Sequence, residues 1–177
     1  IKPYADFLDR GEVLERSEND YNPRHSLEDL IENKNEEELL WRAGKLHGHY
    51  CPNLALGVKA SVYALNHLNL KSEGMEEVLA IVETNSCFSD GVQYITGCTF
   101  GNNALIYKDF GKTAVTITSR EGKALRLYLK EVNLIADRFP EADELFEKVI
   151  VERNGSFEDS EALQQKWKKV GRDIIKI

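Results

Sequence analysis

The sequence predicts an α+β protein in which helices pack on a mainly antiparallel sheet. Apolar residues recur every three or four positions through most of the first 70 residues, as on a buried helix face. Strand-like runs then follow, separated by glycine turn signals. With 177 residues, 42% of them hydrophobic, the chain is large enough for a single compact domain with its own core.

Two short helices are expected ahead of the candidate site. The first has a start resembling a capping box at Ser26, and a second start lies at Asn35. The second helix carries an apolar face up to Gly44, after which the chain reaches His47.

The strongest helical pattern follows Pro52, and we expect it to form the central buried helix. Apolar residues recur there at three- and four-residue intervals up to Leu65. Beyond a break at Gly74, residues 78–82 form a continuous apolar run of the length expected for an interior strand.

A short helix and a group of strands are expected next. Residues 88–96 can form the helix, with Gly97 as its left-handed cap. Turn signals at Gly111 and Gly122 then predict three strands that pair as an antiparallel meander. These strands cover residues 105–110, 113–118 and 124–129.

Charged helices are expected at residues 141–151 and 160–171, after Pro140. This pattern divides the chain into three parts. They are an N-terminal extension (1–24), a compact α+β domain (25–150) and a C-terminal helical extension (151–177).

Composition narrows the classes of partner. The net charge of −7, from 30 acidic and 23 basic residues, has the wrong sign for a nucleic-acid binder. No apolar run approaches the roughly 18 to 20 residues that span a bilayer, so we expect neither nucleic acid nor membrane as a partner. The chain begins at Ile1 rather than Met, which suggests that an upstream segment was removed, and the cytoplasm is the expected compartment.

Three good metal ligands stand at intervals of two, at His47, His49 and Cys51. On a helix, at about 100° per residue, His49 would face away from the other two, whereas extended backbone points all three to one side. Pro52 favours extended backbone before it and suits the first position of a helix. We therefore expect an extended segment with Cys51 as the N-cap, where the helix dipole lowers the pKa of its thiol.

These ligands predict a transition-metal site. Two imidazoles and a thiolate suit zinc, although nickel and iron accept the same groups. Cys87 follows a predicted strand at its carboxyl end, where sites in α/β sheets gather, and is our choice for the fourth ligand over water or substrate. Each residue alone fits a polar loop or a small buried side chain, but three ligands within five residues favour a metal.

Cys98, Asp90 and Lys112 are candidates for a catalytic role. A helix rising 1.5 Å per residue would hold Cys98 roughly 15 Å from Cys87, so Cys98 is a second thiol or a pocket wall. Asp90 could orient an imidazole or cap the short helix. Lys112 could hold an anionic substrate or be an ordinary turn lysine.

Four separated motifs resemble the FmdE family, named for a component of formylmethanofuran dehydrogenase, over about residues 25 to 150. They are His47-Gly48-His49-Tyr50-Cys51-Pro52 with residues 54–57, then residues 83–87, 96–101 and 110–112. The resemblance implies an α+β domain, usually a homodimer, with a metal-associated pocket. Its residues in this chain would be His47, His49, Cys51, Cys87 and Cys98, with Asp90 and Lys112 near them.

Two functions follow from this resemblance. The first is a metal-dependent protein acting on a small one-carbon or thiol compound, and the second is a non-catalytic accessory subunit or metal-carrying module of a larger molybdenum or tungsten oxidoreductase. The chain lacks the Cys-x-x-Cys pairs of the zinc ribbon that family members often carry. It also has Asn102-Asn103 where a lysine-glycine pair is common in the family.

Overall fold

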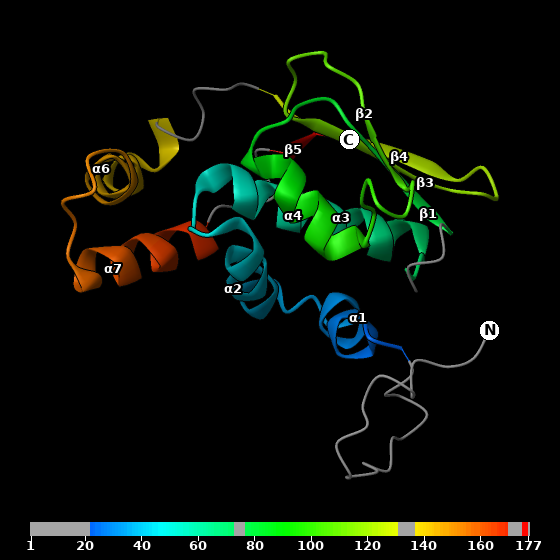
Figure 1. The fold of residues 1–177 in the computed structure, drawn as a ribbon, viewed down its shortest axis with the longest axis horizontal. Coiled ribbons are helices and arrows are strands. Elements are labelled where there is room, and N and C mark those ends of the chain that lie inside the picture. The colour runs from blue at the N-terminus through cyan, green and yellow to red at the C-terminus, as the bar shows by residue number, and fades with distance from the viewer. Residues whose placement is uncertain (1–21, 73–76, 131–136, 170–174, 177) are drawn as a thin grey trace, which may run out of the picture.

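A five-stranded sheet forms one layer of the part that the computed structural model describes, residues 22–72, 77–130, 137–169 and 175–176 (Figure 1). All neighbouring strands are antiparallel except the first two in the sheet, which are parallel, so the expected mainly antiparallel α+β class is confirmed. The order across the sheet is β2 (Leu105–Tyr107), β1 (Val78–Val82), β3 (Ala114–Ser119), β4 (Ala124–Leu129) and β5 (Ile175–Lys176).

The expected three-strand meander is wrong. β3 and β4 form the predicted hairpin, but β2 lies on the other side of β1 and pairs with it in parallel. The apolar strand β1 buries alternate residues and lies inside the sheet, paired with β2 on one side and β3 on the other. A parallel pair needs a crossover, which the helix between β1 and β2 supplies.

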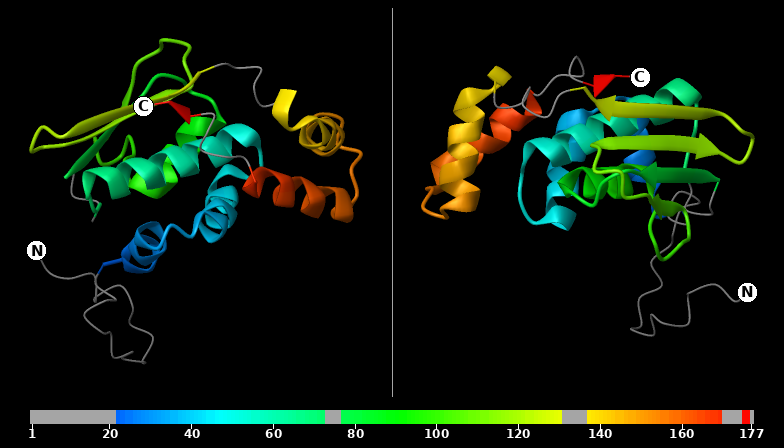
Figure 2. Two further views of the ribbon diagram at one scale, coloured as in Figure 1. Left: turned by 180° about the vertical axis from the view of Figure 1, so that it is seen from behind. Right: turned by 90° about the horizontal axis from the view of Figure 1, so that it is seen from above.

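Four helices lie on one side of this sheet, two of them packed against its face and two packed mainly on the first two (Figure 2, left). The expected central helix is confirmed as α3, because 11 of its 17 residues are buried. α4 packs against α3 more extensively than any other two elements pack together. The four are α1 (His25–Glu32), α2 (Glu36–His47), α3 (Pro52–Leu68) and α4 (Cys87–Thr96).

Two glycines let α3 and α4 cross with their backbones almost in contact. A Cβ atom on Gly91 would lie 2.6 Å from the carbonyl oxygen of Leu54, and one on Gly57 would collide with that of Phe88. No other residue has a side chain small enough for these positions. The close crossing brings the N-terminal ends of α3 and α4 together, and those ends carry Cys51 and Cys87.

The helix boundaries confirm some sequence signals and correct others. Asn35 caps α2 as expected, its side chain accepting from the N–H of Glu38. α1 begins at His25 with no side-chain cap, so the predicted start at Ser26 is wrong. α2 continues through Gly44, which packs against the Tyr50 ring, and ends only at His47.

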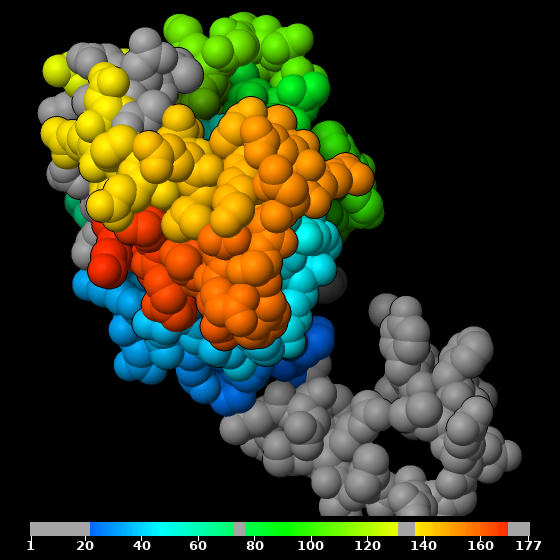
Figure 3. All heavy atoms as spheres, turned by 90° about the vertical axis from the view of Figure 1, so that its left-hand side faces the viewer, coloured from blue at the N-terminus to red at the C-terminus, as the bar shows by residue number. Residues whose placement is uncertain are grey.

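The C-terminal helices pack beside the core through α7 (Phe157–Lys168), which contacts α2 and α3, and α6 (Pro140–Phe146) packs on α7 (Figure 3). α6 continues as the π-helix η3 (Glu147–Val151), so the expected domain boundary after residue 150 falls inside a helix. α7 begins with a capping box at Ser156, earlier than the expected helix start at residue 160, and its Trp167 is fully buried. Most of the proposed N-terminal extension, the Gly74 break and residues 170–171 lie outside the described residues.

Every helix in the described ranges is too short or too polar to cross a bilayer.

Candidate metal centre

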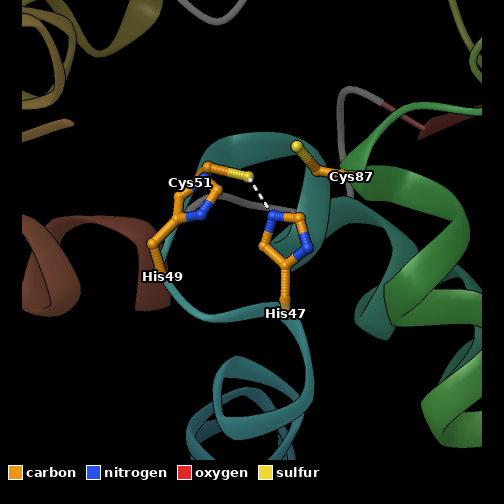
Figure 4. A group of neighbouring side chains, drawn as sticks. All are labelled: His47, His49, Cys51 and Cys87. Carbon is orange, nitrogen blue, oxygen red and sulfur yellow. Dashed lines mark hydrogen bonds between the residues drawn. The ribbon is translucent and has the colours of Figure 1, made fainter. Parts of the chain in front are cut away.

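Four side chains converge between the end of α2 and the starts of α3 and α4 (Figure 4). Each offers one candidate ligand atom, and these atoms all lie within 4.8 Å of one another. Cys51 is buried, and the other three are half-buried. The four are His47, His49, Cys51 and Cys87, the same residues that the sequence analysis assigned to a metal.

The backbone brings these groups together by a turn, so the predicted extended segment is wrong for most of its length. His47 is the last residue of α2, and Gly48 ends the helix in the left-handed region at φ 91°. Only Cys51 is shown to be extended, at φ −143° and ψ 163°. The turn after Gly48 sets the His49 ring beside that of His47, with centroids 4.3 Å apart.

Both sulfur atoms lie at the positive end of a helix. Cys51 is the N-cap of α3 as predicted, and its Sγ accepts from the N–H of Leu54 at 3.4 Å. Cys87 is the first residue of α4. Unpaired N–H groups and the helix dipole stabilise negative charge at such positions, which favours thiolates that can bind a metal.

The thiolate character falls on Cys87 rather than on Cys51, which corrects the expectation for Cys51. A hydrogen bond from the Cys51 thiol lowers the pKa of Cys87 to about 5, opposed by burial and assisted by contact with the His47 imidazole. The pKa of Cys51 is raised, because its thiol donates to Cys87 and is buried. The more exposed sulfur carries the charge at the smaller desolvation cost.

His49 favours the neutral form that binds metals. Burial lowers the pKa of His49, and positive charge on His47 lowers it further, while contact with Cys87 raises it. A neutral imidazole keeps a free electron pair on one ring nitrogen. The protein environment therefore prepares His49 as a ligand near neutral pH.

Asp90 orients His47 through a short hydrogen bond. This is one of the two roles that were predicted for it from the sequence. The Nδ1 atom of His47 lies 2.7 Å from Oδ2 of Asp90, which favours a proton on Nδ1. Nε2 then faces the site, 3.9 Å from the Cys51 sulfur. The other oxygen of Asp90 accepts from Nε2 of Gln93 at 3.1 Å, so the carboxylate is itself held in place.

The donor set fits a tetrahedral ion after a small contraction. Zinc bonds of about 2.0 to 2.3 Å place neighbouring ligand atoms about 3.3 to 3.8 Å apart. The present spread of up to 4.8 Å needs movements of side chains only, on the order of 1 Å. Two nitrogen and two sulfur donors are a set that zinc prefers, and nickel and iron accept them too.

The structure places Cys98 outside this group and Lys112 on the exposed surface. Cys98 follows the opposite end of α4, where its buried thiol donates to the carbonyl oxygen of Val78 at 3.3 Å. Lys112 is exposed, and its backbone N–H bonds the carbonyl of Glu83 at 3.1 Å. Catalytic roles for these two residues stay predictions.

Two residues that border the site were missed by sequence reasoning. Gln93 stands three positions after Asp90 on one helix, and this spacing alone could have indicated the contact. Phe146, whose ring centroid lies 6.5 Å from that of His49, comes from the junction of α6 and η3. No local signal connects Phe146 to His49, because only the packing of the C-terminal helices brings it there.

The fold and the four converging donors define the class as an α+β protein with a two-histidine, two-cysteine pocket of metal-binding type. A family profile described as "FmdE, Molybdenum formylmethanofuran dehydrogenase operon" matches residues 46–177, and the chain belongs to this FmdE family. The resemblance seen in the sequence motifs is thereby confirmed.

Two known proteins illustrate the relationship. A crystal structure of a tungsten formylmethanofuran dehydrogenase FmdE-like protein from Syntrophus aciditrophicus has a TM-score of 0.55 and 27% identity, covering 80% of this chain and 69% of that chain. A probable S-adenosyl-L-methionine-binding protein from Archaeoglobus fulgidus is 43% identical over 183 aligned positions, which include this whole chain and 48% of the relative. The chain therefore spans about half the length of that curated relative.

Proposed function

We propose that this protein binds one transition-metal ion, with zinc as the first choice and nickel or iron as alternatives. The observation that carries the proposal is the convergence of four soft or borderline donors within 4.8 Å. The hydrogen bond from His47 to Asp90 supports it, because metal-binding imidazoles commonly donate their second N–H to a carboxylate. When bound, the ion would supply Lewis acidity or a rigid link between α2, α3 and α4.

The first role that we propose for this centre is binding and conversion of a small one-carbon or thiol compound. Half-exposure of His49 and Cys87 supports this role, because a substrate can reach that side of the site. Displacement of one protein ligand would open a coordination position for it. Asp90 would act as a positioning residue through His47.

An accessory role has its own support. Four protein donors fill a tetrahedral ion, as in structural zinc sites, and leave no position for a substrate. The solved relative from Syntrophus aciditrophicus is named for a component of a larger dehydrogenase, which supports a partner enzyme as the docking partner. A second copy of this chain is the partner that the family resemblance implies. In this role the metal fastens the ends of three helices.

Metal content of ligand variants tests the site. Wild-type protein purified without chelator should hold about one ion per chain, and His49→Ala and Cys51→Ala should lose most of it. His67→Ala and Cys98→Ala are matched controls, because His67 is exposed near the end of α3 and Cys98 is remote from the pocket; both should keep the ion. Full metal content in both ligand variants would contradict the assignment.

A cobalt-substituted sample separates the two roles. The visible spectrum of tetrahedral cobalt reports the ligands around the ion. A spectral change on adding a small thiol supports an open site that accepts substrates. A spectrum that does not respond, together with a large fall in Tm after chelation, supports the accessory role.

A further inference from the structure

The two sulfur atoms of the pocket are close enough to react with each other. Sγ of Cys51 and Sγ of Cys87 belong to the set of atoms that lie within 4.8 Å of one another. Each comes from the start of a different helix, and Figure 4 shows the pair at one side of the pocket. The close crossing at Gly57 and Gly91 holds these helix starts together without any metal.

The two thiols differ in access from solvent. Cys51 is only 2% exposed, whereas Cys87 is half-buried. An external reagent therefore meets Cys87 first, and Cys51 stands behind it as a second thiol. Cys98 is 1% exposed and hydrogen-bonded to the backbone of Val78, so it is shielded from both the reagent and the pair.

We propose that Cys51 and Cys87 form an oxidation site, at which a small aliphatic disulfide links the two sulfurs and thereby releases the metal ion. Release of the ion rests on the proposed function. Formation of the disulfide does not, because the two thiols are already neighbours in the metal-free chain.

The reaction is a two-step thiol–disulfide exchange. The Cys87 sulfur attacks one sulfur of the reagent, whose S–S bond breaks and releases one thiolate. The Cys51 sulfur then attacks the Cys87 sulfur of this mixed disulfide, forms the Cys51–Cys87 bond and displaces the second thiolate. The pair gives up two electrons to the reagent, and protons of the cysteine thiols pass to the released thiolates or to solvent.

Disulfide formation removes half of the metal ligands. The sulfurs must approach to about 2.05 Å, and neither then carries the negative charge that binds a metal. Only His47 and His49 are left, and two imidazoles hold zinc far more weakly than the complete set. The pocket would thus load metal under reducing conditions and empty under oxidising ones.

Oxidation of the zinc-loaded full chain with glutathione disulfide tests this proposal. We expect one zinc ion released for every two thiols lost, and peptide mapping should find Cys51 joined to Cys87 with Cys98 free. Cys51→Ser should retain glutathione on Cys87, because the second thiol is missing, and Cys87→Ser should form no internal disulfide. Cys98→Ser is the matched control and should give the wild-type disulfide.

The same treatment of chelator-treated protein separates this inference from the proposed function. A Cys51–Cys87 bond formed without metal supports the oxidation site even if wild-type protein never binds zinc. The proposal is overturned if zinc binds normally but both thiols stay free under the disulfide, or if glutathione stays on Cys87 in wild-type protein. A bond from either residue to Cys98 would also overturn it.

Discussion

The two ends of α4 carry the same kind of residue in opposite surroundings. At the N-terminal end, Cys87 meets His47, His49 and Cys51, side chains that hydrogen-bond with it or lie within reach of a shared metal ion. At the C-terminal end, burial raises the pKa of Cys98, and its thiol donates to the backbone carbonyl of Val78. A thiol's chemistry here depends on its partners and exposure rather than on its sequence neighbours.

The electrostatic surroundings also differ between the two ends of α4. The positive end of the α4 dipole faces a pocket that stabilises a thiolate. The negative end is closed by Arg24, whose guanidinium donates to the carbonyl oxygens of Ser72, Tyr94 and Ile95. The helix thus joins a reactive end to a closed structural end, and changes at each end should have separable effects on metal binding and on folding.

The largest expected loss of stability comes from the structural end. Arg24→Ala removes three hydrogen bonds from a charged donor and leaves carbonyl groups without partners, so we expect unfolding free energy to fall by about 2 to 4 kcal/mol. Urea denaturation measures this change. Metal content per folded chain should be unchanged, and Arg24→Lys should recover part of the stability. Loss of metal from folded Arg24→Ala protein would show that the C-terminal end of α4 also affects the metal pocket.

Gly57→Ala should reduce both stability and metal affinity, because the helix crossing at Gly57 positions the N-terminal end of α4. The new methyl group would meet the carbonyl of Phe88, and relief requires α3 and α4 to separate. We expect a loss of about 1 to 3 kcal/mol in denaturation and weaker metal binding. Gly101→Ala is the matched control, since the nearest atom to its Cβ would be 3.7 Å away. Equal behaviour of the two variants would show that the crossing has no such role.

Asp90→Asn should weaken metal binding by about 10- to 100-fold with little change in folding. The amide keeps the size of the carboxylate but removes the charge that orients His47 and supports its Nδ1 proton. Competition with a chromogenic chelator gives the affinity, and thermal unfolding of the metal-free protein gives the stability. If stability falls while affinity does not, Asp90 serves the fold rather than the pocket.

Glu83 anchors the segment that leads from β1 to the reactive end, and its effect should depend on pH. Arg126 donates to both carboxylate oxygens at 2.6 and 2.8 Å and lowers the pKa of Glu83. The pair therefore stabilises the fold above the ordinary carboxyl pKa and loses this effect as pH falls through the lowered value. Glu83→Gln should cost about 1 kcal/mol at pH 7, and the difference from wild type should vanish in acid. A difference that is constant with pH would contradict the ion pair.

The smallest effect is expected for Cys98→Ser. A serine hydroxyl can donate to the same carbonyl of Val78, so stability should change by about 1 kcal/mol or less. Metal content should be that of wild type, and any activity that is found with a small thiol or one-carbon compound then tests the predicted catalytic role. Loss of such activity with intact metal would support the catalytic role predicted for Cys98.

Several local features could be predicted because their causes lie within a few residues. Strands β1 and β4 have the predicted bounds, and Gly97 closes α4 in the left-handed conformation. The cap at Asn35 and the N-cap position of Cys51 also follow from adjacent residues. The pairing of β2 with β1 could not be predicted in this way, because it depends on contacts between residues that are distant in sequence.

By itself, the sequence determined the class of the fold, the starts of α2 and α3 and the identity of four good metal ligands, since periodicity, capping and side-chain chemistry are local properties. Tertiary structure alone decided how the four groups converge, by a turn after Gly48 rather than by the extended segment expected from the sequence. It also decided that Phe146 borders the pocket and that the thiol pKa is lowered at Cys87 and raised at Cys51. The physical reason is that distance, burial and proton sharing arise only when α3 and α4 cross at their two glycines.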